Sequence, residues 1–388
     1  MHFLPDVPIA WLQLTRNKIR LFVALMGITF AAVLIFMQLA FLDSLYESQT
    51  ALHQSLKADL VLTSSKMKTL ANTTVFPRQH LYRALNFDEV AAVNYIYYGQ
   101  KSLRYKGDAG GKGIIVIGIN PEDPPFNVPQ LEQQAPQLKA IGTVLFDRNS
   151  DLKEYGDIVK DLEPGLPIVA ELGNQKIRIS GIVDFAGASF ADDGNLITSS
   201  ATFSKLMSGR KADDITIGLI SLKPNADRQH ALKKIASQLP SSVQIMSVEN
   251  FIKHEKNYWS TSAPIGFIFG MGVLVGFFVG VIIVYQILYN EVSDHLSDYA
   301  VLKARGYKHR FFIGVLFQEA LILAVLGYVP GFIIALGLYR ITQNATALPI
   351  YMNLTRAILV LLLTAAMCFV SGAISMHKLK EADPAELF

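Results

Sequence analysis

Cysteine and charged residues are scarce in this chain of 388 residues. The single cysteine, Cys368, lies in an apolar run, which excludes an intramolecular disulfide and a cysteine-ligated metal site. Only 17% of the residues are charged and the formal net charge is +3, which argues against a nucleic-acid-binding protein. Hydrophobic residues make up 51%, more than an average soluble protein contains. This composition predicts a membrane anchor joined to one sizeable water-soluble domain.

Motifs for nucleotide binding and for catalysis are also missing. The segment GDAGGKGI at 107–114 lacks the four residues that separate the first glycine of a phosphate-binding loop from its Gly-Lys pair. In addition, Gly113 stands where a Ser or Thr would hold magnesium. In GASFADDGNLITS at 187–199, Ala191 replaces the second glycine of a nucleophile elbow. The eight histidines show no metal-ligand spacing. We therefore expect both segments to be turns, and we expect neither catalysis nor a metal site in this chain. ATP and magnesium would be bound by a separate subunit.

Four apolar segments are long enough to cross a bilayer, which takes about 20 residues. The expected order is a cytoplasmic amphipathic segment (1–20), span 1 (21–42), an exported domain (43–263), span 2 (264–289), a cytoplasmic helix (290–310), span 3 (311–339), a short exported loop (340–356), span 4 (357–376) and a cytoplasmic tail (377–388). Span 1 lacks a small-x-small cleavage site and follows about 20 other residues, so we expect an uncleaved anchor.

Basic residues near the span ends predict the orientation. They are Arg16, Lys18 and Arg20 before span 1, Lys303, Arg305, Lys308 and Arg310 between spans 2 and 3, and Lys378 and Lys380 after span 4. With four crossings all three groups fall on one side, and short loops rich in Lys and Arg stay in the cytoplasm. Both termini and the 290–310 helix are therefore expected in the cytoplasm.

The exported domain is predicted to be an α+β domain on two helical stalks. Leu45, Leu52 and Leu56 recur at helical spacing, which extends span 1 to about Lys57. Two strand-helix-strand units of βαβ type flank a mainly β inserted lobe at about 106–210. In the second unit we expect Asn225 to cap the helix, and Ser247 to cap the helix that leads into span 2.

Glycines recur in span 2 at helical spacing. Gly272, Gly276 and Gly280 lie every fourth residue, while Gly266 and Gly270 belong to another face. Small residues let helices approach closely in lipid. The repeat predicts either packing within this chain or a dimer contact, and both interpretations stay open.

Span 3 contains an ionisable residue, Glu319, and a helix breaker, Pro330. A carboxylate at membrane depth is costly, so it is expected to face protein or a water-filled cavity. A structural hydrogen bond to a neighbouring helix is favoured over a proton or substrate site, because a single carboxyl group makes no relay. Pro330 predicts a kink.

The charged segment 290–310 predicts an amphipathic cytoplasmic helix. Its apolar face carries Val292, Leu296, Tyr299 and Leu302. Lys303 and Arg305 suit the last turn of the helix, and Gly306 is placed to end it. Because an apolar stripe needs a partner and this chain has no nucleotide site, a separate ATPase is the candidate partner for these seven residues.

The segment DYAVLKARGYKHRFF, followed by FQEALILAVLGYVPGFIIALGL, resembles the coupling region and third span of MacB/FtsX-type ABC transporter permeases. IAWLQLTRNKIRLFVALMGITF resembles their entry into the first span, and HKLKEADPAELF resembles their Pro-Ala-x-x-Leu ending. The resemblance covers nearly the whole chain, without the ATPase domain that is fused to MacB. FPRQHLYRAL and SFADDGNLITS look most like DevC-type permeases.

This resemblance implies a homodimer in the bacterial inner membrane, surrounded by lipid. Each subunit would contact a DevA- or MacB-like ATPase through residues 292–306, and Glu319 would be the carboxylate typical of the third span. A DevB- or MacA-like periplasmic adaptor and a TolC-like outer-membrane channel would complete a tripartite pump. We expect such a pump to export a lipid-like or amphiphilic substrate, such as a glycolipid, by transmitting ATP-driven motion to the exported domain.

Two other functions remain open for a chain of this kind. An FtsX-like signalling scaffold would control a cell-wall hydrolase, and a LolCE-like permease would extract lipoproteins. The sequence identifies neither the substrate nor the face of span 2 that would form a dimer, and it leaves open whether the adaptor and channel are obligatory.

Overall fold

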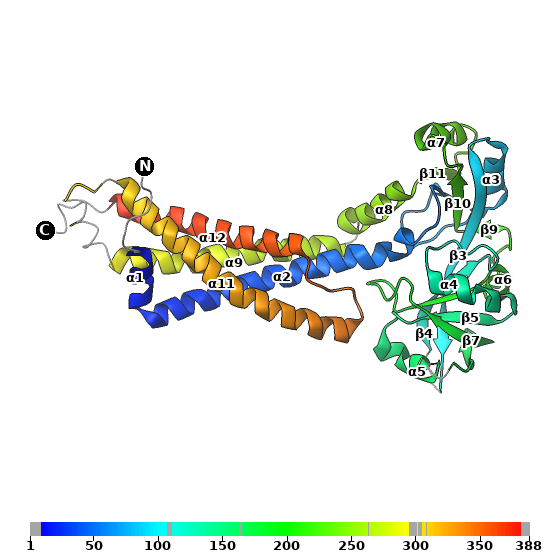
Figure 1. Ribbon diagram of the computed structural model, residues 1–388, viewed down its shortest axis with the longest axis horizontal. Helices are drawn as coiled ribbons and strands as arrows, with labels where there is room; N and C mark the ends of the chain where they lie inside the picture. The colour runs from blue at the N-terminus through cyan, green and yellow to red at the C-terminus, as the bar shows by residue number, and fades with distance from the viewer. Residues whose placement is uncertain are drawn as a thin grey trace. The chain divides into compact units, whose positions relative to one another are not determined.

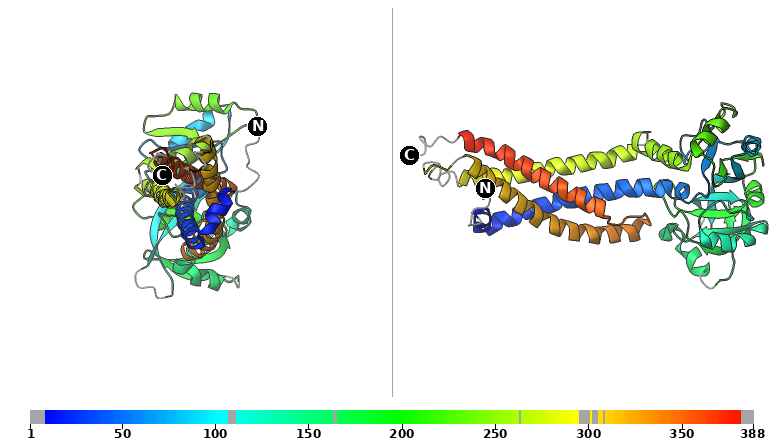
Figure 2. Two further views of the ribbon diagram at one scale, coloured as in Figure 1. Left: turned by 90° about the vertical axis from the view of Figure 1, so that its left-hand side faces the viewer. Right: turned by 45° about the horizontal axis from the view of Figure 1, so that its top comes forward.

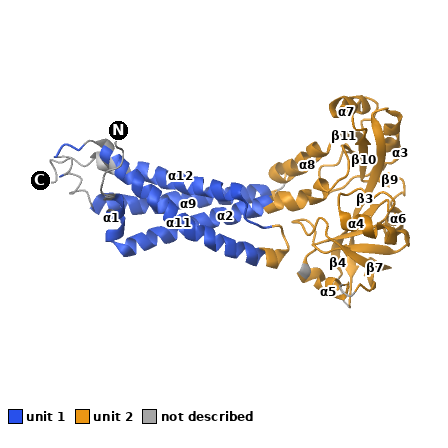
Figure 3. Ribbon diagram, in the orientation of Figure 1, with its two compact units in different colours: residues 1–43, 266–342, 350–388 blue, residues 44–265, 343–349 orange. Residues whose placement is uncertain are grey.

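The structure is a computed structural model of the chain. It describes residues 9–106, 111–162, 165–262, 264–294, 301, 305–307 and 309–381. The chain divides into two compact units, which Figure 3 shows in different colours. The first comprises residues 1–43, 266–342 and 350–388, and the second comprises residues 44–265 and 343–349.

Long apolar helices build the first unit, the membrane unit. The helices are α1 (Ile9–Arg16), α2 (Lys18–Gln54), α9 (Pro264–Asp294), α11 (His309–Thr346) and α12 (Leu354–Glu381). Four of the described helices, all but α1, are long and apolar enough to cross a membrane. Within the unit these four run side by side (Figures 1 and 2). The predicted four membrane helices are confirmed, and α11 continues through Pro330 without a break in the helix.

Small residues let the membrane helices pack closely. One apolar cluster joins Ala24 and Ile28 of α2, Val284 of α9, Ala324 of α11 and Met367 of α12. Lipid tails are as apolar as these side chains, so close packing and hydrogen bonds rather than water exclusion hold the helices together. The cluster therefore depends on small residues at the contacts.

A nine-stranded sheet forms the second unit, with the order β11-β1-β10-β3-β4-β8-β5-β7-β6. We call this unit the exported domain, after the location that the sequence predicts for it. Its strands are β1 (Leu60–Ser64), β3 (Val90–Arg104), β4 (Lys112–Ile119), β5 (Thr143–Asp147), β6 (Ile168–Leu172), β7 (Gln175–Val183), β8 (Asn195–Ser199), β10 (Ile217–Leu222) and β11 (Val243–Ser247), while β2 (Phe76–Pro77) pairs with β9 (Asp214–Ile215). The helices are α3 (Gln79–Tyr82), α4 (Pro129–Gln134), α5 (Leu152–Leu162), α6 (Ser200–Leu206), α7 (Arg228–Ala236) and α8 (Val248–Asn257), with short turns η1 (Arg83–Asn86), η2 (Ala135–Lys139) and η3 (Tyr258–Ser262).

The two predicted strand-helix-strand units interlock. β10 lies between β1 and β3, and β1 lies between β10 and β11, with every one of these pairs antiparallel. Leu60 and Leu62 join the core on one face of the sheet and Val61 joins the core on the other, because side chains alternate along a strand. The predicted fold class, membrane helices with a large α+β domain, is confirmed.

The inserted lobe contains more helix than expected. β4 to β8 form its part of the sheet, and α4, α5, α6 and η2 alternate with these strands, so the lobe is mixed rather than mainly β. β3 joins the lobe to the rest of the sheet, because its first half pairs with β10 and its second half with β4.

The two predicted helix caps have different outcomes. Ser247 caps α8, because its side chain accepts a hydrogen bond from the Asn250 N–H. The prediction for Asn225 is wrong: Asp227 caps α7 and accepts hydrogen bonds from the N–H groups of Gln229 and His230. Both Asn and Asp favour this position, and only the backbone path decides between neighbours two residues apart.

Candidate functional site in the membrane unit

The predicted coupling helix is only partly within the described residues. Leu296, Tyr299, Leu302 and Lys303 lie outside them. The Arg305 N–H donates to the carbonyl oxygen of Val301 at 3.1 Å, and Gly306 has a φ of +95°. That left-handed conformation favours glycine and ends helices.

Val292, the first residue of the predicted docking face, is covered by its own chain. Its side chain is 2% exposed and belongs to the apolar cluster of the membrane unit. A side chain buried inside its own chain is not available to a partner, so the docking face would begin after Val292. Helical periodicity identifies an apolar face but cannot say which neighbour covers it.

An ion-pair cluster joins the N-terminal end of α2 to the C-terminal end of α9. Arg20 Nη1 lies 2.6 Å from Asp294 Oδ2 and 3.4 Å from Glu291 Oε2. The same residues line a cavity of about 610 Å³ together with Arg16 and Lys18. In the sequence, Arg20 stands out only as one of the basic residues that predict orientation, because no local pattern shows that it meets Glu291 and Asp294.

Glu319 is buried in the membrane unit without the expected hydrogen bond. Its exposed fraction is 0%, and neither carboxylate oxygen has a hydrogen-bond partner among the described residues. Its helix neighbours Leu316, Ala320 and Leu323 belong to the apolar cluster. Since a buried polar group without a partner costs free energy, Glu319 is a candidate for a role in function rather than in stability.

The glycines of α9 lie against other helices of the same chain. A methyl group added at Gly272 would meet Gln38 of α2, and one added at Gly280 would meet Met367 of α12 and Ala31 of α2. Gly276 likewise lies against Ile35 and Leu34 of α2. A methyl group at Gly270 would meet nothing within 4 Å. The structure thus places the Gly272, Gly276 and Gly280 face inside the membrane unit.

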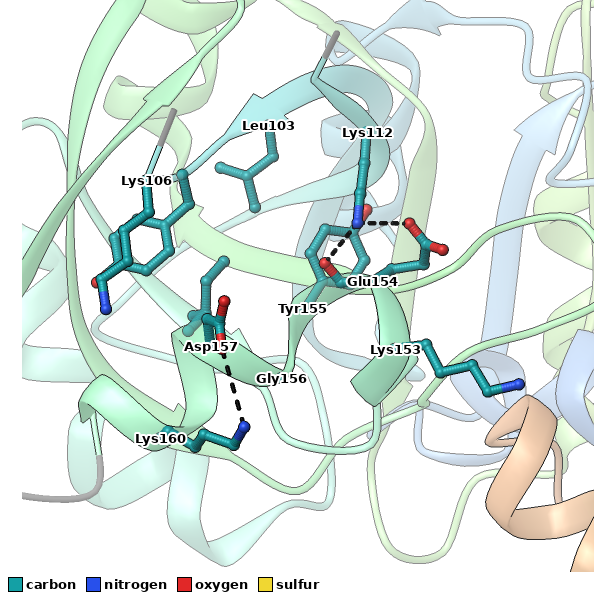
Figure 4. Close-up of a pocket in the computed structure, with 11 residues that line it drawn as sticks. Leu103, Lys106, Lys112, Lys153, Glu154, Tyr155, Gly156, Asp157 and Lys160 are labelled. Carbon is teal, nitrogen blue, oxygen red and sulfur yellow. Dashed lines mark hydrogen bonds and ion pairs between the residues drawn. The ribbon is translucent and has the colours of Figure 1, made fainter. Parts of the chain in front are cut away.

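The exported domain has a hollow of about 480 Å³ beside α5, shown in Figure 4. Lys112 Nζ lies 2.7 Å from Glu154 Oε2, and Lys106 Nζ lies 2.6 Å from Asp161 Oδ2. Lys153 extends away from the hollow in this view. Because these two lysines are neutralised within the chain, the hollow offers little charge to a ligand.

A buried carboxylate, Asp147, organises the loop that contains the Asp-Asp-Gly motif. It accepts hydrogen bonds from the N–H of Gly187 and from the Asn195 side chain, while burial raises its pKa. Burial, with the neighbouring Asp193, raises the pKa of Asp192 to about 6. These contacts give Asp147 a structural role. Among the described residues, no three histidines, cysteines or carboxylates are placed to hold a metal ion.

A second buried carboxylate, Glu255, connects α2, α8 and the loop after β1. It accepts hydrogen bonds from the Thr69 hydroxyl, from the Leu70 N–H at 3.2 Å and from Trp259 Nε1 at 2.9 Å. His53 Nε2 of α2 lies 3.5 Å from Glu255 Oε2, the oxygen that accepts from the Leu70 N–H, and the side chains of His53 and Glu255 are both buried. Burial acts to raise the pKa of Glu255, but His53 and the hydrogen bonds outweigh burial and lower it. This network has no signal in the sequence, because its members are scattered along the chain.

Comparison with known proteins relates the chain to membrane permeases. Residues 257–384 match the family described as FtsX-like permease C-terminal. No curated protein matches the chain.

Three solved structures resemble the chain over about half its length. The periplasmic region of MacB from Actinobacillus actinomycetemcomitans is 12% identical, with a TM-score of 0.36, and the match covers 52% of this chain and 94% of that one. The extracellular domain of the noncanonic ABC-type transporter YknZ from Gram-positive bacteria is 15% identical, with a TM-score of 0.34 and coverages of 49% and 98%. A domain of a putative permease from Porphyromonas gingivalis is 11% identical, with a TM-score of 0.30 and coverages of 50% and 89%.

Proposed function

We infer that this chain, an ABC permease of the MacB/FtsX type, passes the ATP-driven motion of a separate ATPase to its exported domain and so drives efflux. The observation that carries this proposal is the family match over residues 257–384, which takes in all of α9, the segment before α11, α11 and all of α12. The substrate class we propose is lipid-like or amphiphilic, such as a glycolipid.

The described contacts supply a route for this motion. The segment that would contact the ATPase follows α9 directly, and Arg20 pairs with Glu291 and Asp294 at that end of α9. A displacement of α9 would therefore act on α2 through an ion pair, as well as through the packing of Gly276 against Ile35. α2 continues beyond the membrane unit to Gln54, so it can pass the displacement on.

The partners we propose are those that the resemblance to MacB/FtsX-type permeases implies. The chain would form a homodimer in the bacterial inner membrane, with both termini in the cytoplasm and one ATPase on each subunit. An adaptor in the periplasm and a TolC-like channel would receive the substrate, and the DevC type is the form of pump that we favour.

The proposal predicts that Leu296→Asp uncouples the ATPase from the exported domain. A carboxylate in an apolar docking face is desolvated without a partner when the ATPase binds. We expect the ATP-dependent fluorescence change of a dye on the exported domain to fall by about tenfold, because an unpaired buried charge weakens the docking of the ATPase. The dye would be attached at Lys68→Cys in a Cys368→Ser chain, co-purified with its ATPase in nanodiscs.

Asp298→Asn is the matched control, because it changes a residue on the opposite, polar face of the same predicted helix. It should leave the fluorescence change within about twofold of the unaltered chain. A full response from Leu296→Asp would contradict the assignment of the docking face. An unaltered chain that never binds an ATPase would contradict the proposed function as a whole.

A further inference from the structure

A buried arginine ties three membrane helices together at the end of the bundle opposite to Arg20. Arg356, in the first turn of α12, donates to Asp43 Oδ2 of α2 from Nη2 at 2.6 Å and from Nε at 3.1 Å. Nη1 donates to the carbonyl oxygen of Tyr351 at 2.8 Å. The guanidinium also lies 5.5 Å from the ring centroid of Tyr339 in α11. All these residues belong to the membrane unit.

Local preference does not explain an arginine at this position. The N-terminus of a helix carries a partial positive charge, so a cation in the first turn of α12 is disfavoured there. Its side chain is only 4% exposed, and burying a charge is costly unless the charge is paired. The charge-assisted bonds to Asp43 offset both costs. The arginine is therefore placed for its partner in α2 rather than for its own helix.

Tyr339 extends the same contact. Its hydroxyl donates to the carbonyl oxygen of Phe36 at 2.7 Å, about two turns before Asp43 in α2. Thus α2 is held to α11 through Tyr339 and to α12 through Arg356. We call Asp43, Tyr339 and Arg356 the outer cluster.

The position of the outer cluster along α2 is informative. At about 1.5 Å per residue, Arg20 and Asp43 lie about 35 Å apart along the helix, slightly more than the hydrocarbon core of a bilayer at about 30 Å. In a bilayer of that thickness, the two charges would lie near the two membrane surfaces. α2 is anchored to α9 at one surface and to α11 and α12 at the other, just before it enters the exported domain at Ser44.

We propose that Arg356 is a positioning residue that fixes the outer end of α2, so that displacement at the cytoplasmic end reaches the exported domain instead of being lost as tilting of α2. This inference rests on the proposed function. An α2 released from α12 would still be held by apolar packing, but packing against small residues resists sliding less than a bond between charges at fixed geometry.

The first arm of the test measures the pair itself, without the ATPase. The full chain in nanodiscs would carry Asp43→Arg, Arg356→Asp or both, and thermal unfolding would be recorded for each. We expect each single variant to unfold at a lower temperature and the double variant to recover most of the loss, since an aspartate in the first turn of α12 also suits the helix dipole. If the unfolding temperature of the double variant falls by the sum of the two single-variant decreases, the proposed pairing is overturned.

The second arm measures transmission in the complex with the ATPase, using ATP and the dye at Lys68→Cys. Arg356→Lys keeps the charge but cannot make the same set of bonds, so the ATP-dependent fluorescence change should fall by about fivefold while ATP hydrolysis stays within about twofold. The Asp43→Arg/Arg356→Asp chain should restore the response. Arg104→Gln, which breaks a half-exposed ion pair with Glu171, is the control and should change nothing.

The outcomes separate the two proposals. A normal response in the unaltered complex together with a normal response from Arg356→Lys and Arg356→Asp would overturn the role of Arg356 alone. No ATP-dependent response in the unaltered complex would contradict the proposed function, and the role of Arg356 with it. A fall in the response that the charge-swapped chain does not restore would also overturn the role of the pair.

Discussion

Replacing Glu255 with glutamine is expected to lower the free energy of unfolding of the full chain by about 2–4 kcal/mol. Thr69, Leu70 and Trp259 all donate to the two carboxylate oxygens. An amide has only one oxygen, so at least one of these donors would face an NH₂ group and stay buried without an acceptor. The attraction to His53, 3.5 Å away, would also be lost.

Unfolding of the detergent-solubilised chain, followed by Trp259 fluorescence in a Trp11→Phe background, measures this effect. The chain has two tryptophans, and Trp259 bonds directly to Glu255. Glu249→Gln on the same helix is the control, because its exposed pair with Arg228 should contribute less than about 1 kcal/mol. If Glu255→Gln and this control have the same free energy of unfolding, the network contributes nothing to the stability of the exported domain.

The same network predicts a pH dependence. The pKa of Glu255 is lowered on folding, so the carboxylate stabilises the folded state at pH values above its unfolded pKa of about 4.3. That stability is lost as the pH falls below this value, and Glu255→Gln should lose less stability over the same range. The same unfolding experiment, repeated at several pH values for the unaltered chain and for Glu255→Gln, measures this difference.

Replacing Glu319 with methionine is expected to have the opposite sign and to raise the free energy of unfolding by about 1–3 kcal/mol. The carboxyl group is fully buried, and neither oxygen has a partner among the described residues. Methionine has a similar length and a flexible, apolar side chain, so it should fill the space without the cost of an unsatisfied polar group.

Ser371→Ala provides the control for Glu319→Met. Ser371 is also buried in the membrane unit, but its hydroxyl donates to the carbonyl oxygens of Val281 and Met367. Its loss should therefore destabilise the chain by about 1 kcal/mol. Thermal unfolding in the same detergent compares the three proteins. Destabilisation by Glu319→Met would mean that the carboxylate has a structural partner, and would remove the argument for a role in function.

The membrane helices were predictable because each signal is local. About 20 apolar residues in a row suffice to identify a span, and the bilayer thickness does not depend on the rest of the fold. The two strand-helix-strand units were also predictable, since β1, α7 and β11 each carry their own periodicity, whereas their interlocking in one sheet was not. Local sequence thus predicted these elements and the fold class, but not the helices α4, α5 and α6 of the inserted lobe.

The contacts that matter for the proposed mechanism were not predictable in this way. Asp43 and Arg356 are separated by 313 positions, and no local pattern says that two distant charges at span ends will meet. Val292 shows the same limit, because its apolar face was recognised but its neighbour inside the membrane unit was not. Glu319 was recognised as unusual, yet the hydrogen bond predicted for it is absent from the described contacts.

In the mechanism we propose, the 290–310 segment meets a cytoplasmic ATPase while the exported domain lies across the membrane. Labelling of spheroplasts with a membrane-impermeant maleimide tests it most directly, using Leu296→Cys and Lys68→Cys in separate Cys368→Ser chains. We predict that Lys68→Cys is labelled in intact spheroplasts, and that Leu296→Cys is labelled only after the membrane is permeabilised. Labelling of Leu296→Cys in intact spheroplasts would contradict the account.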